Sequence, residues 1–432
     1  MKWFHACALS VCLVAMTSFS TAVVAADESP LTLRRAIDAT LAGNPELQTF
    51  AFEFRAQDAR VEQARLRPAP TVSVDVENIL GTGETRGADS AEFTFALSQV
   101  IELGGKRGAR IASAQAQRDV LAIDRQARQL DVLAEVTRRF ITVATRQEQL
   151  ALAREALKLA EKTVSGARTR VDAAKSPHAE LDRASIGLDR ARLDERRAIV
   201  QLDTARKQLA AMWGESQPVL DNQIMGRAAA DLYQLPPPTD FDELITRIER
   251  NPDFLRFASQ ARLADADLRL AATLRRPDVD VGVGLRRLQG SRDEALVASF
   301  SMPLFSGSRA RSYLEEAQAN RELVDAGRRV AEVKAKATLY ELHRELGAAL
   351  DEAQTLRDDI LPRTSEALRE TQYAYDRGRY SYIELVDAQR EFLALRAALI
   401  DASSNAQSLR VEIERLTNAP LAPDTHSSLE PK

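Results

Sequence analysis

Residues that could carry out covalent or metal chemistry are few in this 432-residue sequence, and they are scattered. Both cysteines, Cys7 and Cys12, fall in an apolar N-terminal stretch. Beyond that stretch the histidines are His178, His343 and His426, which are far apart and match no metal-ligand spacing. The sequence therefore predicts no thiol nucleophile, no metal centre and no cofactor, and it gives no indication of an enzyme.

Two glycine-containing motifs fall short of nucleotide-binding patterns. Gly104-Gly105-Lys106 is followed by Arg107 instead of Ser or Thr, and Val100 stands where a phosphate loop has its first glycine. Gly282-Val283-Gly284 lacks the third glycine of a dinucleotide fingerprint. We expect neither motif to bind a nucleotide.

A pair of carboxylates is the remaining candidate for chemistry. Glu384 and Asp387 are three residues apart, so a helix places both on one face. Taken alone, this spacing is typical of a solvated helix surface. What the pair does depends on the elements that position it.

The N-terminus predicts export. Lys2 precedes an apolar stretch from Ala6 to Ala22, and small residues follow at Ala25 and Ala26. This pattern indicates a cleaved secretory signal at 1–26 rather than a membrane anchor. No later segment offers the ~20 apolar residues of a membrane helix, so a mature chain that spans a bilayer must use strands. The net charge of −4 gives no electrostatic reason to expect nucleic acid.

The chain contains a duplication. At an offset of 207 residues, Asn44-Pro45 matches Asn251-Pro252, and Pro70 matches Pro277. We expect two units of the same fold, at 27–213 and 240–417, joined by a linker at 214–239 and followed by a disordered tail at 418–432.

Each unit has the same predicted order of a helix, two strands and a helical hairpin. Pro362 predicts a kink in the second half. The expected helices are 31–67, 108–174, 177–213, 240–275, 309–377 and 381–417, and the expected strands follow Pro70, span 91–102, and lie near 279–285 and 296–304.

The strands alternate between apolar and polar residues, as in Val72-Ser73-Val74-Asp75-Val76. Such segments suit a transmembrane barrel with a lipid-facing and a lumen-facing side. Soluble hairpins with one buried face are the alternative. Four strands cannot close a barrel, and an open edge in lipid leaves backbone groups unpaired. The sequence therefore predicts that several copies of the chain contribute to one barrel.

The long helices carry seven-residue repeats. Val136, Val143 and Leu150 hold one position of the repeat, with alanines such as Ala153 and Ala160 at the companion position. This spacing predicts left-handed coiled coils. A helix from 108 to 174 extends roughly 100 Å, which suits a periplasmic tunnel. An isolated coiled-coil rod also accounts for the repeats, but not for the alternating strands.

The order of these motifs resembles the TolC, or outer membrane factor, family. The resemblance covers almost the whole mature chain. Its short motifs are the two Asn-Pro pairs, the string from Gln99 to Arg107, Met302-Pro303-Leu304-Phe305-Ser306-Gly307, Ile360-Leu361-Pro362, and Tyr375-Asp376-Arg377-Gly378. The Glu-Leu-Gly-Gly-Lys-Arg string at 102–107 is similar to the heavy-metal, CzcC-like branch.

The resemblance implies a mostly helical subunit that adds four strands to a trimeric, twelve-stranded barrel in the outer membrane, continued by a helical tunnel in the periplasm. It also implies a periplasmic adaptor and an inner-membrane pump of the resistance-nodulation-division type as partners. The cargo it suggests is divalent metal cations such as cobalt, zinc and cadmium.

The resemblance also assigns site residues at the closed tip. Glu384 and Asp387 fit the family's acidic pattern after the second turn, so three copies would form a cation-attracting ring. Tyr375 and Arg377 are further candidates for gate contacts. The expected adaptor contacts at the two turns are Lys175, Ser176, Pro177, Gly378, Arg379, Tyr380 and Ser381.

Two rival interpretations remain open at this point. The chain could be a periplasmic structural or adaptor-like coiled-coil protein, although no β-rich module separates its helices. It could also be a channel of the same family that serves drug efflux or type I secretion. A trimer in the outer membrane would separate the channel from the rod or adaptor.

Overall fold

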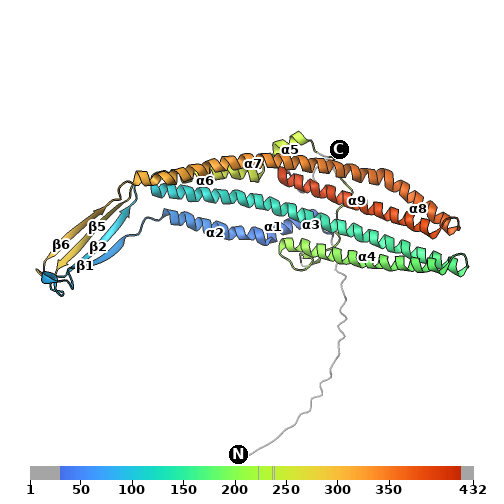
Figure 1. The fold of residues 1–432 in the computed structure, drawn as a ribbon, viewed down its shortest axis with the longest axis horizontal. Coiled ribbons are helices and arrows are strands. Elements are labelled where there is room, and N and C mark those ends of the chain that lie inside the picture. Colours follow the sequence, from blue (N-terminus) through green and yellow to red (C-terminus); the bar gives the residue numbers. More distant parts are fainter. Residues whose placement is uncertain (1–29, 222, 236, 238, 420–432) are drawn as a thin grey trace, which may run out of the picture.

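The computed structural model describes residues 30–419 except 222, 236 and 238, so the predicted signal at 1–26 and most of the predicted tail lie outside the described residues. The molecule is elongated, with a β-sheet at one end and two helical hairpin turns at the other (Figure 1). Helices connect the two ends.

The elements of the first half follow the predicted order. They are α1 (Leu33–Gly43), α2 (Pro45–Arg65), β1 (Thr71–Glu77), the short helix η1 (Gly83–Thr85), β2 (Glu92–Ile101), α3 (Lys106–Asp172), α4 (His178–Ala210) and the short helix η2 (Ala211–Trp213). A linker with the two-residue strands β3 (Val219–Leu220) and β4 (Gln223–Ile224) leads into the second half.

The second half repeats the order. Its elements are α5 (Phe241–Ile248), α6 (Pro252–Thr273), β5 (Val279–Leu288), β6 (Glu294–Ser301), α7 (Ser306–Thr355), the π-helical turn η3 (Leu356–Ile360), α8 (Leu361–Asp376) and α9 (Tyr382–Thr417).

The expectation of single helices over 31–67 and 240–275 is wrong, because each is broken at its Asn-Pro pair. Asn44 ends α1, and its side-chain oxygen accepts a hydrogen bond from the Leu47 amide that begins α2. Its amide nitrogen donates to the Met212 carbonyl at 2.8 Å. Asn251 does the same in the second half, where it donates to the Arg415 carbonyl at 2.7 Å. The helical conformation is unfavourable for a residue that precedes proline, so the helix is interrupted at each asparagine. The asparagine side chains then tie the first helices of each half to the end of its last helix.

The predicted kink at Pro362 appears as a change of helix type. Proline lacks the amide hydrogen that would pair one turn back. The chain widens into the π-turn η3 over the five residues before α8, in which Pro362 occupies the first turn. The helix therefore continues past the proline, and α8 bends toward the hairpin turn (Figure 1).

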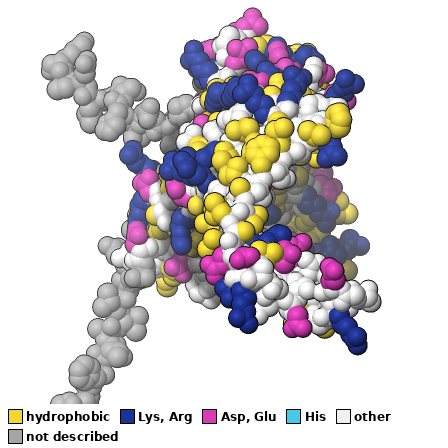
Figure 2. All heavy atoms as spheres, turned by 90° about the vertical axis from the view of Figure 1, so that its left-hand side faces the viewer, with side chains coloured by type: hydrophobic (Ala, Val, Ile, Leu, Met, Phe, Trp, Pro, Cys, Tyr) yellow, Lys and Arg dark blue, Asp and Glu magenta, His cyan; other side chains and the backbone are white. Residues whose placement is uncertain are grey.

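The four strands from both halves form one antiparallel sheet in the order β1-β2-β5-β6. Its register aligns the apolar residues of neighbouring strands: one row runs through Val74, Phe95, Leu285 and Leu296. Each of these four side chains is more than half exposed. The predicted alternation is therefore confirmed, and a continuous apolar face lies uncovered in the single chain. Figure 2 shows this end of the molecule with hydrophobic side chains on its surface.

The opposite face of the sheet is built from small and polar residues. A Cβ atom added at Gly284 would lie 2.7 Å from the Phe95 carbonyl oxygen and 2.9 Å from the Ala96 Cβ. Such distances exclude a side chain without a backbone shift. Glycine here lets two strands approach closely on the polar side.

The helices pack with alanine seams, as the seven-residue repeats predict. Val136, Val143 and Leu150 of α3 are buried, whereas Leu157 and Val164 are only partly covered. In α4 the buried positions recur every seven residues, at Ala184, Ala191, Ala198 and Ala205. Helix α3 contacts both α4 and α9, so it joins the two hairpins along their length. In the described part of the chain, no helix is both long and apolar enough to cross a bilayer.

Candidate functional site

The candidate site is the pair of hairpin turns that lies at the end of the molecule farthest from the sheet (Figure 1). One turn joins α3 to α4 and the other joins α8 to α9. Both are tight and use left-handed backbone conformations, with φ of 54° at Ala174 and 74° at Gly378. The turns bring the ends of helices from both halves of the chain together.

Tyr375 is the centre of the contacts between the two turns. Its side chain, at the end of α8, is only 1% exposed. Its hydroxyl donates a hydrogen bond of 2.7 Å to Glu180 Oε1 in the first turn of α4. The Arg170 guanidinium, near the end of α3, lies 4.7 Å from the Tyr375 ring centre and donates to the Tyr375 carbonyl at 2.9 Å. We name Tyr375, Glu180 and Arg170 the tip latch.

Arg170 also braces the first turn. Its Nε donates to Ser176 Oγ at 3.0 Å, and the same nitrogen lies 3.8 Å from Glu180 Oε1. Glu180 therefore accepts a hydrogen bond from the neutral phenol of Tyr375, in the α8–α9 hairpin. It also lies near the positive charge of Arg170, in its own α3–α4 hairpin. A charge-assisted contact in a partly buried position is stronger than the same pair in water.

Burial, together with the hydrogen bond to Glu180, raises the pKa of Tyr375 above its ordinary value of 10.0. The phenol thus stays protonated at physiological pH and remains a donor. Nearby Tyr382 has its pKa raised as well, mainly by burial. The latch consequently presents one carboxylate, one guanidinium and one neutral phenol, with the phenol of Tyr382 close by.

Glu384 and Asp387, the predicted aperture carboxylates, are both exposed on α9. Glu384 accepts a 2.6 Å hydrogen bond from the Ser381 amide while Ser381 Oγ accepts one from the Glu384 amide, which forms a capping box. These hydrogen bonds lower the pKa of Glu384. Asp387 lies 3.7 Å from Arg390. The structure places the two carboxylates on one helix face, one turn apart, outside the tip latch.

The remaining predicted residues occupy the turns themselves. Arg377 stacks over the Tyr373 ring at 4.9 Å and does not join the tip latch. The predicted adaptor-contact residues all lie in or beside the two turns, and they are Lys175, Ser176, Pro177, Gly378, Arg379, Tyr380 and Ser381.

Sequence reasoning missed Arg170 and Glu180 as site residues. One signal was present: at an offset of 204, Glu180 falls on Glu384, so the two are duplicates. Each lies in the first turn of the second helix of its hairpin. The duplicates have diverged, because Glu384 caps its own helix whereas Glu180 binds the other half of the chain.

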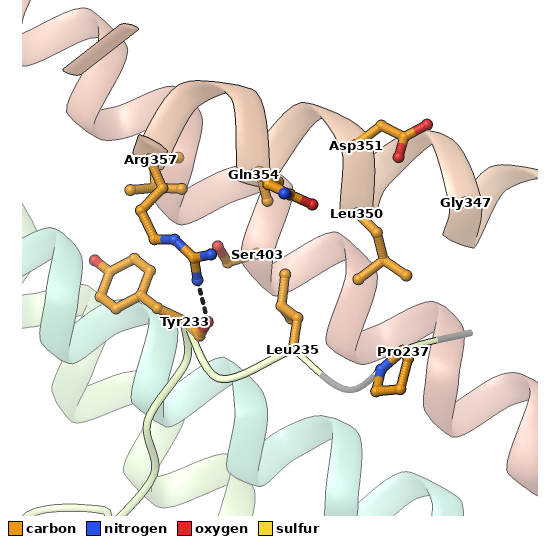
Figure 3. Close-up of a pocket in the computed structure, with 11 residues that line it drawn as sticks. Tyr233, Leu235, Pro237, Gly347, Leu350, Asp351, Gln354, Arg357 and Ser403 are labelled. Atoms are coloured by element: carbon orange, nitrogen blue, oxygen red, sulfur yellow. Dashed lines mark hydrogen bonds between the residues drawn. The ribbon is translucent and has the colours of Figure 1, made fainter. Parts of the chain in front are cut away.

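Several cavities lie along the helices, and two of them bear on the candidate site and the linker. One, of about 580 Å³, is a groove between α3, α4 and α9 that includes Asp387, Arg190 and Asp194. The other, of about 370 Å³, lies beside the linker, where Arg357 donates to the Tyr233 carbonyl at 3.3 Å (Figure 3). The second cavity is far from the turns and marks where the linker packs across η3 and α9.

Among the described residues, no group of three or more His, Cys, Asp and Glu side chains is arranged to hold a metal ion. The contacts observed at the turns include hydrogen bonds, an ion pair and a cation–π contact. A latch that ties two hairpins together can control how far they separate.

Comparison with known proteins shows which family shares this sequence and architecture. The model of the outer membrane efflux protein family matches residues 36–215 and 246–419. The cobalt-zinc-cadmium resistance protein CzcC of Cupriavidus metallidurans is 26% identical over 90% of this chain and 90% of its own. The nickel-cobalt-cadmium resistance protein NccC of Alcaligenes xylosoxydans xylosoxydans is 26% identical over 68% of this chain and 66% of its own.

A solved structure, that of the outer-membrane channel OprN, has the same fold. It superposes with a TM-score of 0.73 at 20% identity, over 90% of each chain. The family model covers both halves of the duplication and the turns that hold the tip latch, and on that evidence the chain belongs to the outer membrane efflux protein family.

Proposed function

We propose that three copies of this chain form an outer-membrane exit duct for divalent metal cations, docked to a periplasmic adaptor and an inner-membrane pump of the resistance-nodulation-division type. Family membership makes the chain an outer membrane efflux protein with a large periplasmic part. The proposal adds the number of copies, the cargo, the partners and the roles of the tip residues.

The exposed apolar face of the sheet is the observation that supports the proposal most. Val74, Phe95, Leu285 and Leu296 form one row of it, although they come from strands in both halves. Exposure of so much contiguous apolar surface is costly in water. Strands β2 and β5 have ten residues each, the length that a tilted strand needs to cross a bilayer.

The open edges of the sheet support the proposal that several copies of the chain form one barrel. Strands β1 and β6 each have a neighbour on one side only. Backbone groups at such edges must be paired inside lipid. If β6 of one copy pairs with β1 of the next, three copies give a closed barrel of twelve strands, wide enough for a solvent-filled lumen.

The helices extend the duct. Helix α3 has 67 residues and therefore a length of about 100 Å. In three copies, the paired hairpins would surround a tunnel whose narrow end lies at the turns. There Glu384 and Asp387 are proposed to attract cations, and the tip latch is proposed to hold the hairpins together in the closed state.

The turns are also the proposed docking surface for the adaptor. Lys175 and Arg379 are exposed in the two turns, and the turns form the extreme end of the molecule. An adaptor that contacts both turns could compete with the latch. Docking and opening would then be linked through Tyr375 and Glu180.

The similarity to CzcC supports metal cations as cargo. The alternative of drug efflux or polypeptide secretion is tested by deleting the gene from its host. The proposal predicts lower tolerance of zinc, cobalt or cadmium with unchanged tolerance of hydrophobic antibiotics, and restoration by a plasmid copy. The reverse pattern of sensitivity would rule out the metal assignment.

A further inference from the structure

The junction between the sheet and the helices carries a strong positive charge. The segments 65–67, 102–111, 275–278 and 302–311 together contain nine Lys and Arg residues and two Asp and Glu residues. The whole chain, by contrast, has a net charge of −4. A local excess of this size indicates an anionic partner at the junction.

Part of this charge is used within the chain. Arg65 pairs with Glu62 at 2.9 Å. The basic residues at the start of α3 also have partners: Lys106 pairs with Asp278 at 2.7 Å, Arg110 pairs with Glu102, and Arg107 donates to the backbone carbonyl of Arg65 at 2.6 Å. These contacts fasten α3 to the segments that enter and leave the sheet. Both carboxylates of the junction are thereby occupied.

The rest of the charge has no partner in the described part of the chain. Arg67, Arg275, Arg276, Arg309 and Arg311 are all exposed, and no ion pair or side-chain hydrogen bond joins any of them to a described residue. We name these five residues the arginine collar. In the surface view of this end of the molecule, Lys and Arg side chains lie beside the apolar sheet (Figure 2).

The collar begins where the apolar face ends. Arg67 precedes β1 by four residues, Arg275 and Arg276 precede β5 by four and three residues, and Arg309 and Arg311 follow β6 in the first two turns of α7. The last apolar residues before the collar are exposed: Met302 by 41%, Leu304 by 64% and Phe305 by 80%.

Phe305 adds a second observation. Its φ of 63° is in the left-handed region, which costs a residue with a side chain about 1 kcal/mol or more. Gly105, which precedes α3 in the first half, has the same conformation without that cost. A strained and exposed aromatic ring next to a basic cluster is typical of a membrane interface.

We propose that the arginine collar binds the phosphate groups of anionic phospholipids in the periplasmic leaflet of the outer membrane, with Leu304 and Phe305 reaching the edge of the hydrocarbon. This inference rests on the proposed function, because it requires the sheet to span the bilayer. The occupant follows from the chemistry: guanidinium groups bind phosphate in a bidentate manner. A second copy of the chain is a poor occupant, since it would bring the same positive charge to the contact.

The collar would set the depth of the barrel. Arg309 and Arg311 lie within about 10 Å of Phe305 along the axis of α7, given a rise of 1.5 Å per helical residue. That distance is comparable with the screening length at physiological salt. The headgroups would therefore hold the helices outside the bilayer while the apolar face stays inside it.

The test uses the full-length protein, purified in a nonionic detergent, delipidated, and titrated with phosphatidylglycerol or with phosphatidylcholine. Binding is followed by native mass spectrometry and by the thermal unfolding temperature. Each basic side chain near an anionic surface contributes roughly fivefold to binding. Arg275→Gln with Arg276→Gln and Arg309→Gln should therefore weaken phosphatidylglycerol binding by at least tenfold and leave phosphatidylcholine binding unchanged.

A matched control carries Arg196→Gln, Arg328→Gln and Arg344→Gln, which are exposed arginines of α4 and α7 away from the sheet. It should bind phosphatidylglycerol like the original protein. A measurement that needs no variant is the salt dependence: raising sodium chloride from 0.1 to 0.5 M should reduce the phosphatidylglycerol effect severalfold. Lipid binding that ignores salt would overturn the proposal even if the collar variant failed to fold.

Conductance in planar bilayers separates this inference from the proposed function. A collar variant that conducts normally and still binds phosphatidylglycerol would contradict the lipid proposal without affecting the proposal that the protein is a channel. A change in ion selectivity with unaltered lipid binding would place the arginines in the lumen and also overturn the proposal. Failure of the unmodified protein to insert at all would instead contradict the proposed function.

Discussion

Tyr375 and Glu180 connect the two halves of the duplicated chain through one hydrogen bond of 2.7 Å between a phenol and a carboxylate. At the duplicated positions, Tyr375 is replaced by Val171, and Glu180 corresponds to Glu384, which caps its own helix instead. The duplicated positions therefore do not form an equivalent link. The Tyr375–Glu180 hydrogen bond joins the two hairpins at the end of the molecule that is proposed to open.

Removing the phenol hydroxyl should loosen the tip. Tyr375→Phe leaves Glu180 with Arg170 as its only partner in the latch, at 3.8 Å, and the lost hydrogen bond to a charged group costs about 1–3 kcal/mol. We expect a severalfold higher conductance of the closed channel in planar bilayers. Tyr373→Phe is the matched control, because Tyr373 is 57% exposed and lies outside the latch. Equal conductance of both variants would remove the latch from the gate.

The start of α9 should weaken at acidic pH. Hydrogen bonds from Ser381 lower the pKa of Glu384 from its ordinary value of 4.5. A carboxylate with a lowered pKa stabilises the folded state above its ordinary pKa and loses that contribution as the pH falls through the folded-state value. Limited proteolysis at the α8–α9 turn should therefore accelerate below about pH 4.5.

The substitution Glu384→Gln isolates this effect. It should make the turn more sensitive at neutral pH and remove that part of the acid dependence. Asp387→Asn, three residues along the same face, should leave the acid dependence intact. If both variants retain the same pH profile as the original protein, Ser381 and Glu384 do not control this helix end.

The two faces of the sheet should respond differently to charge. Val74 is 55% exposed on the apolar face, and Ser73 beside it points to the polar face. Val74→Arg should reduce insertion into the outer membrane, since an arginine facing lipid costs about 2–4 kcal/mol near the bilayer centre. Ser73→Arg, in the same strand, should insert with a much smaller loss. Membrane fractionation with detection of the oligomer measures both, and equal insertion would contradict the assignment of the faces.

The aperture carboxylates should govern block by cations. Glu384→Gln combined with Asp387→Asn removes both exposed charges from each copy, and six from a trimer. The concentration of a multivalent cation that halves the conductance should then rise by about tenfold or more, as expected for the loss of an acidic ring. Asp189→Asn with Asp203→Asn, two exposed carboxylates of α4, is the control. Unchanged block in the double variant would remove the ring and leave the fold unaffected.

Much of the fold could be predicted from the sequence because its signals were periodic. Alternation in β1, β2, β5 and β6, and the seven-residue repeat of α3, α4 and α9, are both confirmed by the structure. The duplication reinforced each signal by showing it twice. Helix boundaries were harder to predict where a single proline ends a helix. Pro45 and Pro252 divide helices that apolar patterning alone predicts to be continuous.

The candidate site was harder to predict. Arg170, Glu180 and Tyr375 meet because three helix ends converge, and two of them are separated by about two hundred residues in the chain. No local pattern encodes such a contact. The arginine collar was likewise hidden, since its members are dispersed over three segments and only the sheet topology brings these segments to one end.

The measurement that tests the central claim most directly is the mass of the purified mature protein in detergent, determined together with its conductance in planar bilayers. The account predicts a trimer that forms stable, water-filled pores, because four strands leave two edges open in lipid. A monomer that stays soluble in plain buffer and never conducts would contradict it.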